Sequence, residues 1–138
     1  MTQWHRTLND DAFSEQFNAG TYPVEHFTHE AHIRLAWIHL TQFGESMAIS
    51  NVTNQIKKFV AIHGASDKYH ETLTVAAVKT VFHFLQRSSK DTFESFIEEF
   101  PRLTLHFKDL LDAHYSPEVL HTEEARYQFL EPDLLPYS

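Results

Sequence analysis

The sequence predicts an all-α fold: a four-helix-bundle-like single domain with an extra N-terminal helix and a C-terminal segment that closes one end of the bundle. Apolar residues recur at helical spacing along most of the chain, and no segment predicts a strand convincingly. Only three glycines leave few turns for hairpins, while twelve phenylalanines supply bulky core side chains. The 138 residues form one expected domain, 1–138, which is long enough to bury a core without disulfides.

Four helices are expected in the first two thirds of the chain. They span residues 10–19, residues 28–43, a segment from Ser46 to His63, and a segment from Asp67 or Lys68 to Arg87. Side chains that cap helix starts and glycines that end helices flank these segments. The expected caps and stops are Asn9 or Asp10, Gly20, Thr28, Gly44 and Gly64.

Shorter helices are expected in the last third. Asp91-Thr92-Phe93-Glu94 has the spacing of a capping box with Asp in place of Ser or Thr, and Pro101 kinks or divides the helix that it opens. Ser116-Pro117 predicts a helix start with proline at the first helical position. Thr122 is expected to cap a further short helix, and the tail over 131–136 is expected to be extended.

Composition excludes several classes of function. The formal net charge of −8 argues against a nucleic-acid partner or an anionic membrane surface, because both attract clustered Lys and Arg. No stretch approaches the ~20 apolar residues of a membrane span, and the first residues lack the apolar core of a secretory signal. The absence of cysteine excludes disulfides and thiolate metal sites. We therefore expect a cytoplasmic protein.

Eleven histidines are the most informative feature of this composition. On a helical wheel, His29 and His32 fall on the same stripe as Ile33, Ala36 and Leu40, which should face the core. Burying an imidazole without a partner costs about 1–3 kcal/mol. These histidines therefore need hydrogen bonds, a ligand or a metal.

The expected topology places further polar residues at the end of the bundle where His29 and His32 lie. Short connectors predict an up-down-up path, which brings the starts of the second and fourth helices together. His70 and Glu71 lie at the start of the fourth helix, and His63 lies at the end of the third. If residues 91–113 form one kinked helix, His114 arrives at that end as well.

This arrangement suggests a mononuclear metal site. In that hypothesis His29, His32 and His70 bind one divalent transition metal (Zn, Fe, Mn or Ni), Glu71 supports the site or acts as general base, and Arg126 orients an acidic substrate. The spacing is one residue short of the His-Glu-x-x-His zinc motif. The paired Glu-x-x-His motifs of di-iron bundles are also absent.

A metal-free alternative uses the same end of the bundle. His70 beside Glu71 would act as a general base, and Tyr69 would donate a proton or hydrogen bond. Further substrate-binding candidates in the predicted pocket are Thr74, His63 and His114.

The resulting functional prediction is a small-molecule-binding protein or enzyme with a histidine-rich pocket at one bundle end. An alternative from another class is a non-catalytic helical interaction or regulatory module whose histidines are structural. An exposed apolar helix face would favour the module, and a closed polar cavity would favour the enzyme. A homodimer is a candidate assembly, because small acidic bundles often pair.

Three segments resemble those of a group of small bacterial helical proteins. The group has an F-x-H-x-x-H-[LI] helix, a Y-H-x-T-[LI]-T helix start and a terminal A-R-x-x-[FW]-x-x-P-D stretch. The resemblance covers most of the chain and implies a shared helical fold and a shared site, but no reaction. The matching positions are Phe27, His29, His32, Tyr69, His70, Thr72, Thr74, Arg126 and Asp133.

Overall fold

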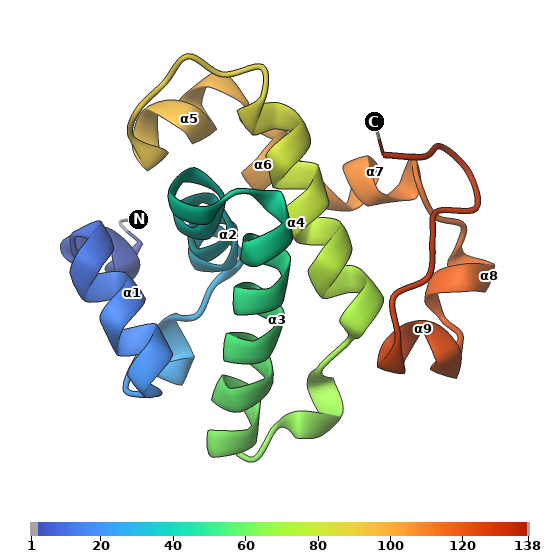
Figure 1. Cartoon of the computed structure of the whole chain (residues 1–138), viewed down its shortest axis with the longest axis horizontal. Coiled ribbons are helices and arrows are strands. Elements are labelled where there is room, and N and C mark those ends of the chain that lie inside the picture. Colours follow the sequence, from blue (N-terminus) through green and yellow to red (C-terminus); the bar gives the residue numbers. More distant parts are fainter. Residues whose placement is uncertain (1–2, 138) are drawn as a thin grey trace. The chain divides into compact units, whose positions relative to one another are not determined.

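The computed structural model describes residues 3–137, and these residues form helices and no strand, which confirms the all-α prediction (Figure 1). The chain groups into two compact units with the boundary between Tyr69 and His70. We call residues up to 69 unit 1 and those from 70 unit 2, and describe each by itself. The predicted four-helix arrangement relates helices of both units, so it stays a prediction.

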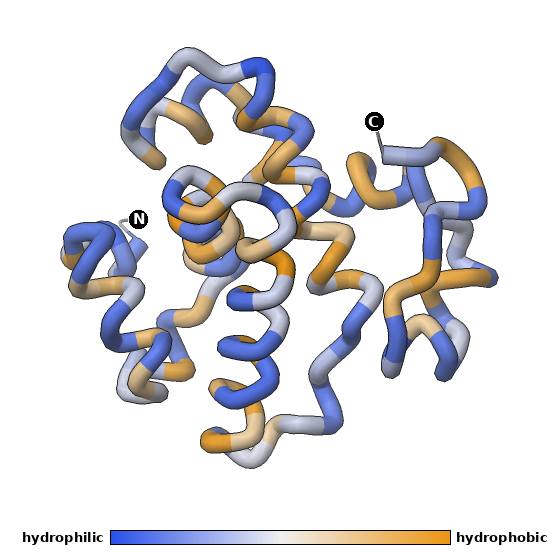
Figure 2. Tube along the Cα trace, viewed as in Figure 1, coloured by the Kyte–Doolittle hydropathy of each residue, from blue (hydrophilic) through white to orange (hydrophobic). Residues whose placement is uncertain are grey.

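Over residues 3–69, unit 1 forms three α-helices and three short 3-10 turns. The helices α2 and α3 pack against each other, and α1 contacts both of them. Figure 2 shows α3 as alternating hydrophilic and hydrophobic bands, as expected of a helix with one face toward a core. The elements are η1 (Trp4–Thr7), α1 (Asp10–Ala19), η2 (Val24–His26), α2 (His29–Phe43), α3 (Glu45–Ile62) and η3 (Ser66–Lys68).

Local side-chain chemistry determines where these helices begin and end. The Asn9 side chain accepts a hydrogen bond from the backbone N–H of Ala12 at 2.7 Å, and Thr28 caps α2 in the same way. Gly20 ends α1 with a left-handed φ of 79°. The predicted caps and stops of these two helices are therefore confirmed.

Aromatic rings form the core between α1, α2 and α3. Tyr22 is fully buried and lies 5.3 Å from the ring of Phe13, while Phe17 stacks on Phe59 at 4.7 Å between ring centroids. Phe27, just before α2, adds a further ring 5.3 Å from Phe59. Edge-to-face and stacked pairs of this kind add about 0.5–1.5 kcal/mol each beyond burial.

Unit 2 is built around α4 (Glu71–Leu85), which packs against α7 and α9. The prediction that this helix starts at Asp67 or Lys68 is wrong, because His70 adopts an extended backbone and caps the helix with its ring. The remaining helices are α5 (Phe93–Glu99), α6 (Arg102–Leu105), α7 (Phe107–Asp112), α8 (Pro117–Leu120) and α9 (Glu123–Tyr127).

Residues 91–113 form three short helices, not one kinked helix. Thr92, not Asp91, accepts the capping hydrogen bond, from the N–H of Ser95. Pro101 separates α5 from α6, and the non-helical backbone of His106 separates α6 from α7. The predicted starts at Ser116 and Thr122 are confirmed, since both side chains accept capping hydrogen bonds.

The C-terminal tail lies along α4. The Thr72 hydroxyl, which is fully buried, donates to the carbonyl oxygen of Gln128 at 2.9 Å and accepts from the N–H of Leu130 at 3.1 Å. Tyr137 donates to the carbonyl oxygen of Ala76. Specific hydrogen bonds thus hold the tail, which bends at residues 133–135 and is not extended throughout as predicted. None of the described helices combines the length and apolar character that a membrane crossing requires.

Candidate functional site

The two histidines at the start of α2 have different surroundings. His29 is exposed at the first helical position, although the wheel placed it on the core stripe. His32 is half-buried as a residue, and its Nε2 atom is buried without a hydrogen-bond partner. Burial, together with the nearby charge of His29, lowers the pKa of His32 to about 4. His32 is therefore neutral at pH 7.

A chain of rings connects His32 to His63 within unit 1. The His32 ring lies 5.5 Å from Phe27, and Phe59 lies 4.6 Å from the ring of His63. Since Phe27 and Phe59 are also neighbours, α2 and the end of α3 bring both histidines against one aromatic cluster. The His63 side chain is exposed at the end of α3.

His70 has a structural role in unit 2. Its Nδ1 atom accepts from the N–H of Leu73 at 3.1 Å, and its Nε2 atom lies 3.0 Å from the carbonyl oxygen of Leu120. This pattern corresponds to the tautomer with its proton on Nε2, which donates to Leu120. Both ring nitrogens are thus engaged, and a metal ion would have to displace one of these hydrogen bonds.

The other predicted site residues are distributed over both units. Tyr69 lies at the end of unit 1, where Lys57 Nζ is 5.4 Å from its ring centroid. In unit 2, Glu71 opens α4 and is half-buried. Thr74 donates to the carbonyl oxygen of His70 at 2.7 Å. Arg126 is half-buried on α9.

His114 also has a structural environment. Its Nδ1 atom donates to the carbonyl oxygen of Leu135 at 2.6 Å, and its ring stacks on Tyr137 at 4.0 Å. His114 therefore holds the C-terminal tail. Over residues 3–137, no group of three or more His, Asp or Glu side chains is placed to hold a metal ion. His29 and His32 belong to unit 1 and His70 to unit 2, so the three-histidine set stays a prediction.

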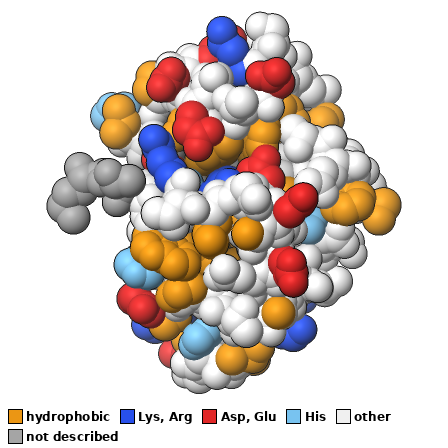
Figure 3. All heavy atoms as spheres, turned by 90° about the vertical axis from the view of Figure 1, so that its left-hand side faces the viewer, with side chains coloured by type: hydrophobic (Ala, Val, Ile, Leu, Met, Phe, Trp, Pro, Cys, Tyr) orange, Lys and Arg blue, Asp and Glu red, His pale blue; other side chains and the backbone are white. Residues whose placement is uncertain are grey.

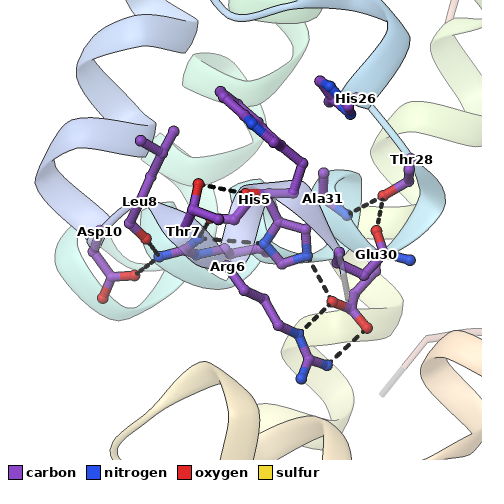
Figure 4. Close-up of polar contacts among 12 residues, drawn as sticks. His5, Arg6, Thr7, Leu8, Asp10, His26, Thr28, Glu30 and Ala31 are labelled. Atoms are coloured by element: carbon purple, nitrogen blue, oxygen red, sulfur yellow. Dashed lines mark hydrogen bonds and ion pairs between the residues drawn. The ribbon is translucent and has the colours of Figure 1, made fainter. Parts of the chain in front are cut away.

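A polar cluster of unit 1 joins the N-terminal turn to α2 (Figure 4). Arg34, with 4% of its surface exposed, donates to the carbonyl oxygens of His5 and Leu8 and to the Asp10 carboxylate. It also lies 3.2 Å from His5 Nδ1, so His5 carries its proton on Nε2, 2.6 Å from Glu30.

Electrostatics in this cluster favour a neutral His5 and an ionised Glu30. Burial lowers the pKa of His5 despite the opposing effect of Glu30. Burial alone would raise the pKa of Glu30, but hydrogen bonds from Arg6 and His5 bring it below its ordinary value. Because His5 is completely buried and its ring nitrogens are engaged, this cluster holds the fold together and does not offer a reactive group.

A second polar feature of unit 1 is an open cleft of about 380 Å³ among α1, α2 and α3, which we call the His39 cleft. His39 is 3% exposed, and its Nε2 atom is buried. The Oε1 atom of Gln55 is buried as well, and Asn51 Nδ2 lies 3.4 Å from His39 Nδ1. Burial lowers the pKa of His39, and a side-chain hydrogen bond with Gln55 partly offsets this.

Polar and acidic side chains make the walls of the His39 cleft. None of the described residues that line it is Lys or Arg; Lys58, outside the lining, donates to the carbonyl oxygen of Asn18. Acidic side chains are spread over the face that carries α1 (Figure 3). The walls are formed by Asp11, Ser14, Glu15, Asn18, Gln42 and Phe43.

This cleft is not predicted by the sequence pattern. Its histidine lies on the buried side of α2, where a helical wheel shows only another core position. A signal was available in α3, where Asn51 and Gln55 occur four residues apart and each directly precedes a buried residue, Val52 or Ile56. No family model, curated protein or solved structure matches this chain.

Proposed function

We propose that this chain is a small-molecule-binding protein and that its ligand occupies the His39 cleft. One observation carries the proposal: a cleft with polar and acidic walls opens among α1, α2 and α3, and the buried imidazole of His39 belongs to its lining.

The size and chemistry of the cleft support a small ligand. A volume of about 380 Å³ lies at the lower end of the range of known ligand pockets. Its walls are mostly amides, carboxylates and a hydroxyl. The amphipathic helix of a protein partner binds instead in an apolar groove. These features favour a small molecule over the interaction-module alternative.

A thermal-shift screen of polar small molecules tests the proposal. We expect at least one compound to raise the melting temperature of the wild type and to lose this effect in His39→Leu and in Gln55→Leu. Gln86→Leu, at an exposed glutamine of unit 2, is the control and should keep the shift. The proposal is wrong if no compound stabilises the wild type, or if the shift is unchanged in both cleft variants.

His32 supports a second candidate function, binding of a divalent transition metal by the His29–His32 pair of α2. The supporting observation is the buried His32 Nε2 atom without a partner, three residues after an exposed histidine. Plasma mass spectrometry on wild type, His32→Ala and the exposed-site control His121→Ala would test it. Metal bound by wild type and His121→Ala, but not by His32→Ala, is expected. Equal metal content in all three proteins would contradict this candidate.

A further inference from the structure

We propose that His5 is an acid-operated switch, and that its protonation releases the N-terminal turn η1 from α2 while the rest of unit 1 stays folded. This switch is independent of the proposed ligand, because it concerns only how the turn is held. The observation behind it is a completely buried imidazole whose two ring nitrogens face groups of opposite charge.

The position of the proton on His5 is determined by two side chains of α2. Arg34 Nη1 lies 3.2 Å from Nδ1 and can only donate, so Nδ1 is the acceptor. The single proton of the neutral ring therefore lies on Nε2, 2.6 Å from the Glu30 carboxylate. From α1, the ring of Phe13 lies 6.0 Å away and does not titrate. A second proton must therefore enter at Nδ1, where it faces the N–H groups of Arg34.

The Arg34 guanidinium is held in place and cannot easily make room for that proton. It donates to the carbonyl oxygen of His5 at 2.6 Å, to that of Leu8 at 2.8 Å and to the Asp10 carboxylate at 2.8 Å. Protonation of His5 would thus place two donors and two positive charges in contact at a buried position. Like charges repel more strongly there than in water, because the local dielectric constant is lower.

The charges of this cluster balance only while His5 is neutral. Two cations, Arg6 and Arg34, pair with two carboxylates, Glu30 and Asp10. Glu30 gains little from a second cation, since Arg6 already donates to both of its oxygens at 2.9 and 3.0 Å (Figure 4). Burial accordingly lowers the pKa of His5, although Glu30 opposes this effect. Protonation therefore adds an excess positive charge that expulsion of the His5 ring into water relieves.

Trp4 reports on the position of the turn. Its ring stacks on His26 at 4.8 Å between centroids, and it precedes His5 in the same 3-10 turn, so expulsion of the His5 ring separates these two rings. A neutral hydrogen bond from Thr28 to Gln3 at 2.6 Å also ties the turn to α2. That contact is weaker than the repulsion within a buried pair of cations.

Fluorine NMR of the full chain labelled with 5-fluorotryptophan tests the switch, in EDTA and from pH 7.5 to 4.5. The resonances of the two tryptophans are assigned with Trp37→Phe. Trp37, 4% exposed on α2, reports on the fold of unit 1. We expect the Trp4 resonance to move below pH 6.5 to the position of a solvent-exposed tryptophan, while the Trp37 resonance stays in place. Over this range Glu30 stays ionised, since its pKa lies below 4.5, and His32, with a pKa of about 4, stays mostly neutral.

Two variants and one direct measurement assign the transition to His5. His5→Gln keeps an acceptor for Arg34 and a donor for Glu30 but cannot be protonated, so its Trp4 resonance should stay in place. His26→Phe keeps a ring against Trp4 without a titratable nitrogen and should show the wild-type transition. Nitrogen NMR of the His5 ring in the wild type should show proton uptake at Nδ1 with the same midpoint as the Trp4 shift.

Several outcomes would overturn the switch. Trp4 and Trp37 resonances that move together indicate acid unfolding of unit 1 and not release of the turn. A transition that persists in His5→Gln, or that disappears in His26→Phe, assigns the pH dependence to another group. If His5→Gln does not fold, the wild type decides: a Trp4 resonance that stays in place, or that moves without coincident protonation of His5, contradicts the proposal.

Discussion

Acid should destabilise this protein through His32, and the size of the effect can be worked out from its surroundings. Burial lowers the pKa of His32 from 6.5 to about 4 in the folded chain. The unfolded chain therefore binds a proton more readily between these two pH values. The stabilising contribution is complete above pH 6.5 and is lost as the pH falls toward 4. A shift of the pKa from 6.5 to about 4 corresponds to about 3 kcal/mol of unfolding free energy.

His32→Phe isolates this contribution, because His5 and His39, whose pKa values are also lowered by burial, remain in the variant. Near pH 7 the variant should be as stable as the wild type or slightly more so, since it removes a buried nitrogen without a partner. Toward pH 4 the wild type should lose about 3 kcal/mol more than the variant.

The assay is urea denaturation followed by circular dichroism at 222 nm, from pH 7.5 to 4, in the presence of EDTA. His32→Leu provides a second apolar replacement in case the phenylalanine ring does not fit. His121→Gln controls for loss of an exposed histidine. A difference in unfolding free energy between wild type and both His32 variants that stays constant over this pH range would refute the reasoning.

Three further predictions concern stability. Arg34→Met should cost about 2–4 kcal/mol in denaturant unfolding, because it leaves the carbonyl oxygens of His5 and Leu8 without their donor. The more exposed Arg6→Met should cost about 1 kcal/mol or less, and equal losses would contradict the role of burial. Thr72→Val should lower the free energy of unfolding by about 1–3 kcal/mol, because it removes both hydrogen bonds to the tail, and it should speed protease cleavage within residues 128–137. Unchanged cleavage would show that other contacts hold the tail. Gly20→Ala should lower the melting temperature and reduce the free energy of unfolding by at least about 1–2 kcal/mol. The backbone φ of 79° strains any residue other than glycine, and the new Cβ would lie 2.5 Å from Ile62 Cδ1. An unchanged melting temperature would contradict this strain.

Helix boundaries that depend on neighbouring residues could be predicted from the sequence. Asn9, Thr28, Ser116 and Thr122 cap helices through hydrogen bonds to backbone N–H groups three residues later, so the signal lies within one turn. His70 also caps a helix, but imidazole is not a usual capping group, and the fourth helix was therefore predicted to start too early.

The candidate site was less predictable, because it depends on which side chains meet. The helical wheel placed His29 on the core stripe, yet His29 is exposed at the first position of α2. The periodicity of apolar residues shows which face of a helix is buried, but not how far along the helix the core extends. The second partner of His70 is Leu120, fifty residues away in sequence. His39, Asn51 and Gln55 form a cleft only because α1, α2 and α3 pack together.

The tail along α4 has a consequence for synthesis on the ribosome. The hydrogen-bond partners of the Thr72 hydroxyl, Gln128 and Leu130, are synthesised more than fifty residues after Thr72 itself. The packing partners α1, α2 and α3 are complete once Ile62 has emerged, so unit 1 can fold while the rest is still being made. In unit 2, by contrast, the Thr72 hydroxyl lacks its two backbone partners until Leu130 has been added.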